Sequence, residues 1–164
     1  MKQKKIIINY EEYEDGENLS SKDLQLVIEA TNALSGSYAP YSDFHVGAAL
    51  MFENGGIVRG SNQENAAYPS GMCAERVAIF HAQSENPDAV IISLAITGRA
   101  DHFISDEPIT PCGSCRQVIA EIEKRQNKKI RIIMKGESGV TKIVSGIESL
   151  LPMMFHEEKL KKTK

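Results

Sequence analysis

Two short runs of the sequence decide how the chain folds: Cys73-Ala74-Glu75-Arg76 and Pro111-Cys112-Gly113-Ser114-Cys115-Arg116-Gln117. Each run opens a stretch of helical composition. Each of these stretches precedes an apolar run typical of a strand buried on both faces, at residues 90–97 and 130–134. Side chains in the first turn of a helix lean toward its N-terminus. We therefore expect the three cysteine sulfurs to meet if the two helices pack side by side on one sheet.

The flanking sequence predicts the remaining elements. Ser20 and Ser21 offer N-caps for a helix whose apolar residues recur every three or four positions and which ends at Gly36. Asn54-Gly55 is a strong hairpin signal between paired strands. The expected elements are helices at 73–81 and 112–123, a short helix at 147–151, strands at 46–52, 57–61, 90–97, 130–134 and 139–144, a short strand at 4–10, an acidic loop at 11–17, and helical residues from Phe155 onward.

The order hairpin, helix, strand, helix, strand predicts an α/β fold. We expect a three-layer α/β/α sandwich on a mixed, roughly five-stranded sheet. A chain of 164 residues with 41% apolar and 25% charged residues is suited to one packed core. We assign residues 20–164 to a single domain and residues 1–19 to an N-terminal extension, to which the sequence gives no function.

Composition and charge narrow the classes of partner. The formal net charge of −3 does not attract a polyanion, so we expect no nucleic-acid binding; the basic run at 159–164 is typical of a solvated end. No apolar stretch approaches the roughly 18 residues that a bilayer span needs. The apolar run at 6–8 is too short for the core of a signal peptide, which makes the cytoplasm the expected location. A small molecule is the favoured ligand.

The three cysteines predict a metal site. Their odd number disfavours a disulfide framework, and in a reducing compartment metal binding or catalysis is expected instead. Three protein ligands with an open fourth position are typical of catalytic zinc, whereas structural sites are closed by four. We therefore expect Cys73, Cys112 and Cys115 to hold one Zn²⁺ per chain. His102, ten residues before Cys112, is the histidine to check as a closing ligand.

Two charged residues beside Cys73 have expected roles at that site. Residues two apart on a helix do not face each other, so Glu75 is not expected to be a further ligand. From the first turn it still reaches the space beyond the helix end, where a carboxylate can hydrogen-bond a metal-bound water. Three thiolates and Zn²⁺ sum to −1, and Arg76 is placed to offset this charge by a hydrogen bond to a thiolate.

These runs resemble the zinc motifs of the cytidine deaminase family, whose Cys₃ ligand set and non-ligand glutamate are a known variant. The resemblance extends to Tyr38–Leu50, Gly60–Pro69 and Leu150–Phe155, in the same order. It implies a cytidine deaminase-like fold and hydrolytic deamination of cytidine and 2′-deoxycytidine to uridine and 2′-deoxyuridine with release of ammonia, as in pyrimidine salvage. It also implies the short Cys₃-zinc type, typically a homotetramer with active sites at subunit interfaces.

The resemblance further implies roles for individual residues. Asn62 and Glu64 would hydrogen-bond the ribose 3′-hydroxyl, which allows ribo- and deoxyribonucleosides alike to serve as substrates. Phe44 would pack against the nucleoside. The backbone of Ala74 would read the polar edge of the cytosine together with Glu75.

The same resemblance implies how the reaction proceeds. Zinc lowers the pKa of a bound water, and Glu75 would carry a proton from this water to N3 of the base and later one to the leaving amino group. Phe155 would cap the base from a neighbouring subunit.

Three alternatives stay open at this point. A closed structural zinc module requires a fourth protein ligand. A thioredoxin-like protein would use Cys112 and Cys115 as a dithiol, but this leaves Cys73 and Glu75 unexplained. A related deaminase would act on blasticidin S, guanine or a base in RNA; the expected sugar contacts of Asn62 and Glu64 and the acidic net charge disfavour it.

Overall fold

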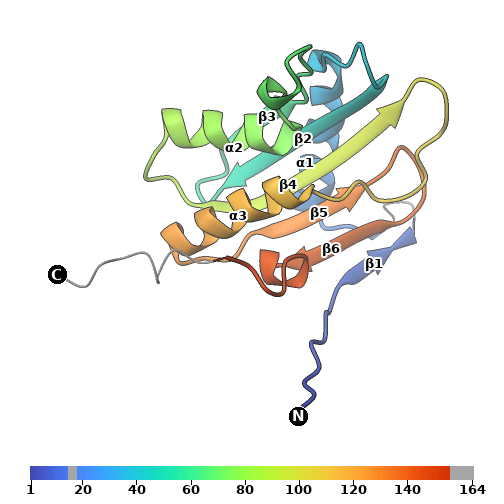
Figure 1. Ribbon diagram of the computed structural model, residues 1–164. Helices are drawn as coiled ribbons and strands as arrows, with labels where there is room; N and C mark the ends of the chain where they lie inside the picture. Colours follow the sequence, from blue (N-terminus) through green and yellow to red (C-terminus); the bar gives the residue numbers. More distant parts are fainter. Residues whose placement is uncertain (15–17, 156–164) are drawn as a thin grey trace.

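A six-stranded sheet forms the centre of the computed structural model, which describes residues 1–14 and 18–155 (Figure 1). The strand order is β1-β6-β5-β4-β2-β3. The strands are β1 (Glu11–Tyr13), β2 (Phe44–Phe52), β3 (Ile57–Ser61), β4 (Ile91–Ala100), β5 (Arg131–Lys135) and β6 (Thr141–Ser145). The helices are α1 (Ser21–Ala33), α2 (Ala74–Glu85) and α3 (Gly113–Gln126), with short 3₁₀ turns η2 (Leu34–Gly36), η3 (Tyr68–Ser70) and η4 (Ile147–Ser149).

The sheet is mixed, as predicted. Strands β4 and β5 pair in parallel, with α3 as the crossover between them, and the other pairs are antiparallel. Both β3 and β4 run antiparallel to β2, so they point in the same direction. Helix α2 follows β3 and helix α3 follows β4. Both helices therefore begin near the same end of these parallel-pointing strands. This topology brings the two helix N-termini together.

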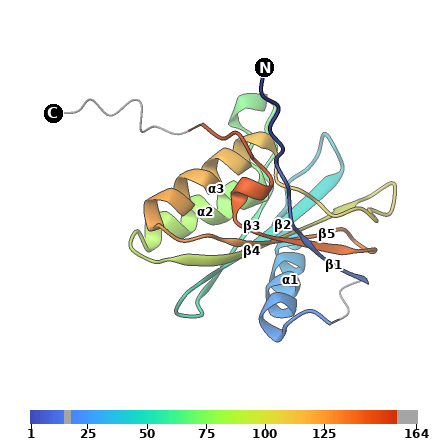
Figure 2. The ribbon, with the colours of Figure 1, turned by 90° about the horizontal axis from the view of Figure 1, so that it is seen from below.

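The helices form the two outer layers of the predicted α/β/α sandwich. Figure 2 shows α2 and α3 on one face of the sheet and α1 on the other. The α2/α3 layer covers the larger core, which includes Leu50, Leu94 and Ile132, whereas α1 packs Leu26 and Ala30 on the opposite face. None of the helices within residues 1–14 and 18–155 combines the length and the apolar composition that crossing a bilayer requires.

Local sequence signals explain the helix start and the hairpin. The Ser20 hydroxyl accepts a hydrogen bond from the Asp23 amide at 3.1 Å and caps α1 as predicted. Strands β2 and β3 pair around a turn in which Gly55 has a φ of 88°, a left-handed conformation that glycine adopts without strain. The predicted helix at 147–151 is the 3₁₀ turn η4, and the expected helical residues after Phe155 lie outside the described residues.

The N-terminal strand differs from the prediction. The predicted strand at residues 4–10 is wrong: strand β1 consists of Glu11–Tyr13, inside the expected acidic loop, and adds a sixth strand to the sheet beside β6. Its anchor is polar. The Glu11 carboxylate accepts hydrogen bonds from the Arg131 guanidinium at 2.6 and 2.8 Å, and Arg131 also pairs with the buried Asp23 of α1. A bidentate arginine–carboxylate pair thus fixes the edge strand.

Close approach of α2 to the sheet depends on a glycine. A Cβ atom at Gly60 of β3 would lie 2.5 Å from the Ala74 carbonyl oxygen and 2.9 Å from the Ala78 Cβ. Both distances are far inside van der Waals contact, so a larger residue must push α2 away from the sheet. Because Cys73 and Glu75 lie at the start of α2, Gly60 also controls where these side chains stand.

We predict that Gly60→Ala lowers the free energy of unfolding by about 1–3 kcal/mol, because overpacking forces a backbone shift. Urea denaturation at a fixed protein concentration measures the change. The matched control is Gly113→Ala, at a helical position where the Cβ atom would meet open space, and it should not lower the unfolding midpoint. Equal midpoints for Gly60→Ala and the unmodified chain would contradict the prediction.

Candidate active site

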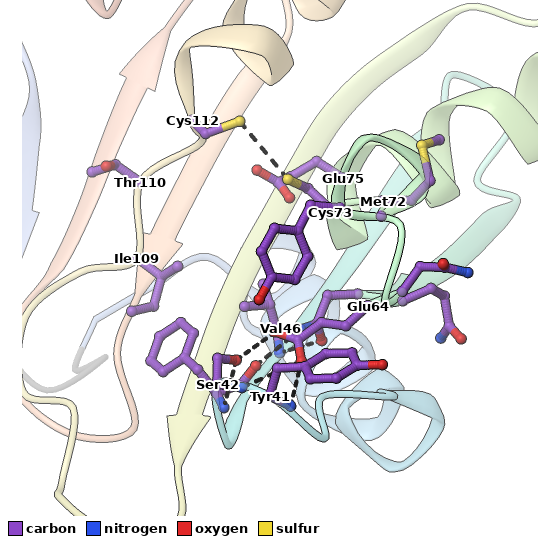
Figure 3. Close-up of a pocket in the computed structure, with 16 residues that line it drawn as sticks. Tyr41, Ser42, Val46, Glu64, Met72, Cys73, Glu75, Ile109, Thr110 and Cys112 are labelled. Atoms are coloured by element: carbon purple, nitrogen blue, oxygen red, sulfur yellow. Dashed lines mark hydrogen bonds between the residues drawn. The ribbon is translucent and has the colours of Figure 1, made fainter.

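A pocket of about 560 Å³ opens where the two helix N-termini meet (Figure 3). Its walls come from the start of β2, the segment after β3, the start of α2 and the loop that leads into α3. The lining residues are Tyr41, Ser42, Phe44, Val46, Asn62, Gln63, Glu64, Asn65, Tyr68, Gly71, Met72, Cys73, Glu75, Ile109, Thr110 and Cys112.

The three cysteines gather at one end of this pocket. Cys73 and Cys112 are the N-cap residues of α2 and α3, and Cys115 lies in the first turn of α3. The Cys112 sulfur lies 3.8 Å from that of Cys73 and 3.5 Å from that of Cys115. Within the described part of the chain, these three residues are the one group of histidine, cysteine and acidic side chains close enough together to share a metal ion.

The sulfur spacing fits zinc. Two sulfurs that each lie about 2.3 Å from a tetrahedral zinc ion are separated by about 3.8 Å. The two separations agree with this value to within 0.3 Å, and all three sulfurs lie within 4.8 Å of one another. The thiolate donor set and the two helix N-termini that face it, each carrying a partial positive charge, both suit a divalent, thiophilic cation.

An arginine supports the negative charge at Cys73. The Arg76 guanidinium donates to the Cys73 sulfur at 3.8 Å, the contact expected from the sequence. Hydrogen bonds from Cys115 and Arg76 lower the pKa of the Cys73 thiol to about 5, while the same contact with Cys73 raises the pKa of Cys115. One thiol of the cluster is thus already a thiolate at neutral pH, the form that binds metal.

Glu75 projects into the pocket from the first turn of α2. Its side chain is only 4% exposed, and Figure 3 shows its carboxylate next to the Cys73 sulfur. Burial raises the pKa of Glu75 above its ordinary value, and the nearby Cys73 thiolate adds to this shift. The carboxylate stands outside the three-sulfur group, so the chain presents one buried acid–base residue beside the sulfurs.

Asn62 lies in the wall of the pocket remote from the sulfurs, in a dense hydrogen-bond network. Its Oδ1 atom accepts from the Ser37 hydroxyl at 2.6 Å and from the Val46 amide at 2.8 Å. Its Nδ2 atom donates to the Phe44 carbonyl oxygen at 2.9 Å. Because an amide nitrogen carries two hydrogens, one Asn62 N–H remains for a ligand.

Glu64 stands beside Asn62 and is held by the loop before β2. Its Oε2 atom accepts from the Tyr41 and Ser42 amides at 2.9 and 3.3 Å, and its Oε1 atom accepts from the Ser42 hydroxyl at 2.6 Å. The hydrogen bonds from Ser42 and Tyr41 lower the pKa of Glu64, which keeps the residue a carboxylate. One lone pair of Oε1 remains free to accept from a ligand.

Of the remaining residues expected at the site, some lie at the pocket and others do not. Phe44 lines the pocket, and Ala74 is fully buried at the start of α2. The described residues that line the pocket do not include Phe155, which is 63% exposed and whose carbonyl oxygen accepts a hydrogen bond from Gln117. His102 pairs with Asp43 at 3.1 Å and lies outside the cysteine group, so among the described residues it does not close the metal shell.

This chain has relatives among known proteins. The profile of the cytidine and deoxycytidylate deaminase zinc-binding region matches residues 20–130. The chain is 41% identical to the cytidine deaminase of Halalkalibacterium halodurans over 81% of this chain and 93% of that protein. The chain belongs to the cytidine and deoxycytidylate deaminase family.

Two further relatives define the range of this family. The structure of cytidine deaminase from Burkholderia pseudomallei superimposes with a TM-score of 0.69 at 35% identity, over 80% of this chain and 98% of that one. The blasticidin-S deaminase of Bacillus cereus is 29% identical over 84% of this chain and 95% of that protein. The deaminase fold therefore extends across most of the chain. The relatives of this chain include deaminases named for more than one substrate.

Sequence reasoning missed the residues that hold the Asn62 and Glu64 side chains. Ser37, Tyr41 and Ser42 belong to a polar loop around Pro40 and meet Asn62 and Glu64 across more than twenty positions of sequence. Hydroxyl-bearing residues in a proline-containing loop are a signal for local hydrogen bonding to the backbone. That signal does not identify a partner so distant in the sequence.

We predict that Cys112→Ala reduces bound zinc from about one ion to less than about a tenth of an ion per chain, because two thiolates do not complete the shell of three. Metal analysis by mass spectrometry after dialysis measures the loss. The matched control is His102→Ala, which should keep full zinc because His102 is paired with Asp43 instead. Stoichiometric zinc in Cys112→Ala would overturn the ligand assignment.

Proposed function

We propose that this deaminase converts cytidine and 2′-deoxycytidine, with water, to uridine and 2′-deoxyuridine and ammonia. The observation that carries the proposal is one pocket with two chemically distinct ends. At one end the buried Glu75 carboxylate lies beside three converging sulfurs, and at the other Asn62 and Glu64 stand side by side. The first end suits hydrolytic attack on the base and the second suits recognition of a sugar.

The catalytic end divides the work between a metal and one acid–base residue. Zinc held by Cys73, Cys112 and Cys115 would supply a water of lowered pKa at its open fourth position. Glu75 takes a proton from the attacking water and delivers it to N3 of the cytosine, which makes C4 electrophilic. The oxygen of the attacking water adds to C4. Glu75 then carries the second proton of the water to the amino group, the C4–N bond breaks, and ammonia departs to leave uridine with a C4 carbonyl. Its burial keeps bulk water from competing for these protons.

The opposite end offers one donor and one acceptor to the substrate. The free N–H of Asn62 and the free lone pair of Glu64 Oε1 complement a hydroxyl group, which both accepts and donates one hydrogen bond. A ribose 3′-hydroxyl is such a group and is present in cytidine and 2′-deoxycytidine alike. Phe44 lies in the same wall and supplies an apolar surface for the nucleoside.

Exposed aromatic residues support a subunit interface at the pocket. Tyr41 and Tyr68 both line the pocket, are 53% and 79% exposed, and pack edge to face. Phe103, 63% exposed, stacks on Phe44 of the pocket wall. A second subunit covering this rim would bury them, and Phe155 of that subunit would reach the base. We therefore propose a homotetramer with active sites shared between subunits. From the proposed reaction we further propose that the enzyme acts in pyrimidine salvage in the cytoplasm.

A second substrate, blasticidin S, is favoured by one observation, the 29% identity to the deaminase of Bacillus cereus that is named for it. Asn62 and Glu64 are the residues expected to distinguish the two substrates, because they face the sugar in the proposed cytidine complex. A kcat/KM for blasticidin S above that for cytidine would replace the proposed substrate and leave the proposed reaction unchanged.

We predict that Glu75→Gln lowers kcat for cytidine by about 10²–10⁴-fold, because the amide cannot accept the proton of the attacking water. The fall in absorbance as cytidine becomes uridine measures the rate. Glu85→Gln, the same substitution at an exposed position on the same helix, should keep the rate of the unmodified enzyme. A Glu75→Gln enzyme with full zinc and near-normal turnover would refute the proton-transfer role.

We predict that Glu64→Gln lowers kcat/KM for cytidine and 2′-deoxycytidine by about 10–100-fold, the cost of losing a hydrogen bond to a charged group. Because 3′-deoxycytidine lacks the hydroxyl in question, its kcat/KM should change several-fold less. This substrate serves as the control for any disturbance of the Tyr41–Ser42 loop, which affects both substrates. Equal losses for cytidine and 3′-deoxycytidine would show that Glu64 does not read the 3′-hydroxyl.

A further inference from the structure

An N-terminal arm, residues 1–10, extends beyond the end of the sheet. In Figure 1 it continues from β1 away from the body of the molecule. Every residue of the arm is exposed, including Ile6, Ile7 and Ile8 at 56%, 80% and 48%. Three consecutive β-branched residues strongly favour a strand, and their exposure to water is unfavourable.

The arm leads directly into an edge strand. Within the described residues, β1 has a hydrogen-bonded neighbour, β6, on one side only. Residues 11–13 therefore present a row of backbone donors and acceptors outward. The partners of β1 end at Ile143 of β6 and β6 itself ends at Ser145, so in the register of β1 the residues before Asn9 lie beyond the end of β6. An exposed edge followed by an exposed apolar segment is a template for pairing with another strand.

The sequence of this segment is complementary to itself. When two copies of residues 2–14 pair antiparallel around a two-fold axis at Ile8, residues whose numbers sum to sixteen stand opposite each other. Three lysines then face three glutamates, and Ile6 faces Tyr10: the ion pairs are Lys2 with Glu14, Lys4 with Glu12 and Lys5 with Glu11. Shifting the register by one residue in either direction loses the full set, so charge selects one alignment.

Side-chain directions in the structure agree with this alignment. Lys142 of β6 lies 3.7 Å from the Glu12 carboxylate and 5.8 Å from the centre of the Tyr10 ring, so Tyr10 and Glu12 share one face. By strand alternation Ile8, Ile6 and Lys4 continue that face. In the paired arrangement Ile8 meets Ile8 at the axis, Ile6 meets Tyr10, and Lys4 meets Glu12. One face of the arm pair is thus apolar at its centre and charge-paired at its ends.

We propose that the N-terminal arms of two copies of this chain pair as antiparallel strands centred on Ile8 and join the two sheets edge to edge. The two-fold axis makes the interface self-complementary, as in most dimers of identical chains. In this arrangement the two folded domains lie on opposite sides of the paired arms and at opposite ends of them, so the domains do not collide. An anionic membrane is the less favoured partner, because Glu11, Glu12 and Glu14 follow the three lysines and would be repelled by it.

Cysteine cross-linking in the zinc-loaded 164-residue chain tests this geometry. Ile8→Cys places two thiols opposite each other at the axis, with Cβ atoms about 5 Å apart, whereas Gln3→Cys places them roughly 34 Å apart. Under mild oxidation Ile8→Cys should give at least about ten-fold more disulfide-linked dimer than Gln3→Cys or the unmodified chain. Equal yields would overturn the proposal. Deaminase activity does not enter the measurement, so the test is independent of the proposed function.

A charge exchange tests the register. In the Ile8→Cys background, Lys4→Glu and Glu12→Lys each place like charges opposite each other and should each lower the cross-linking yield at least about five-fold. The two together restore opposite charges, and the yield should recover. No recovery, or no loss in the single variants, would contradict the alignment. Co-sedimentation of the unmodified chain with phosphatidylserine vesicles, combined with no Ile8→Cys dimer, would assign the arm to a membrane instead.

Discussion

The meeting of two helix N-termini at one point is the constraint on which the site depends. Three sulfurs within 4.8 Å of one another repel once they are thiolates, and they stay together only if positive charge faces them. The N-termini of α2 and α3 provide part of this charge, Arg76 provides more at Cys73, and a bound divalent cation would complete it. The thiolate cluster therefore depends on electrostatic stabilisation, which requires the N-termini of α2 and α3 to lie at the same place.

Sheet topology meets that requirement before any side chain is considered. Because β3 and β4 are both antiparallel to β2, the helices that follow them start at the same end of the strands and cover one face of the sheet. Gly60 then allows α2 to lie close enough to β3 for its first turn to reach the space in front of α3. The side chains in the opposite wall of the pocket are positioned by hydrogen bonds instead. There the loop around Ser37, Tyr41 and Ser42 fixes Asn62 and Glu64 by hydrogen bonds to their side-chain oxygens.

The sequence predicted the parts of this arrangement that depend on local spacing. The separation of Cys112 and Cys115 and the position of Cys73 before a helix were enough to predict the cluster, which the structure confirms together with the mixed α/β/α fold. Strand β1 was misplaced because its anchor, the pairing of Glu11 with Arg131, joins residues 120 positions apart. Periodicity and propensity describe neighbours in sequence, so contacts of this kind leave no local trace.

The misplaced strand also clarifies what the isoleucines at 6–8 do. Their β propensity is real, but β6 ends at Ser145, which the register of β1 sets opposite Asn9, so the sheet of their own chain ends before them. The pocket lies toward the other edge of the sheet, where β2 and β3 stand, whereas the arm leaves from the β1 edge. Association through the arm and coverage of the pocket rim by another subunit would therefore use separate surfaces. One chain can make both contacts at once, because neither requires residues that the other buries.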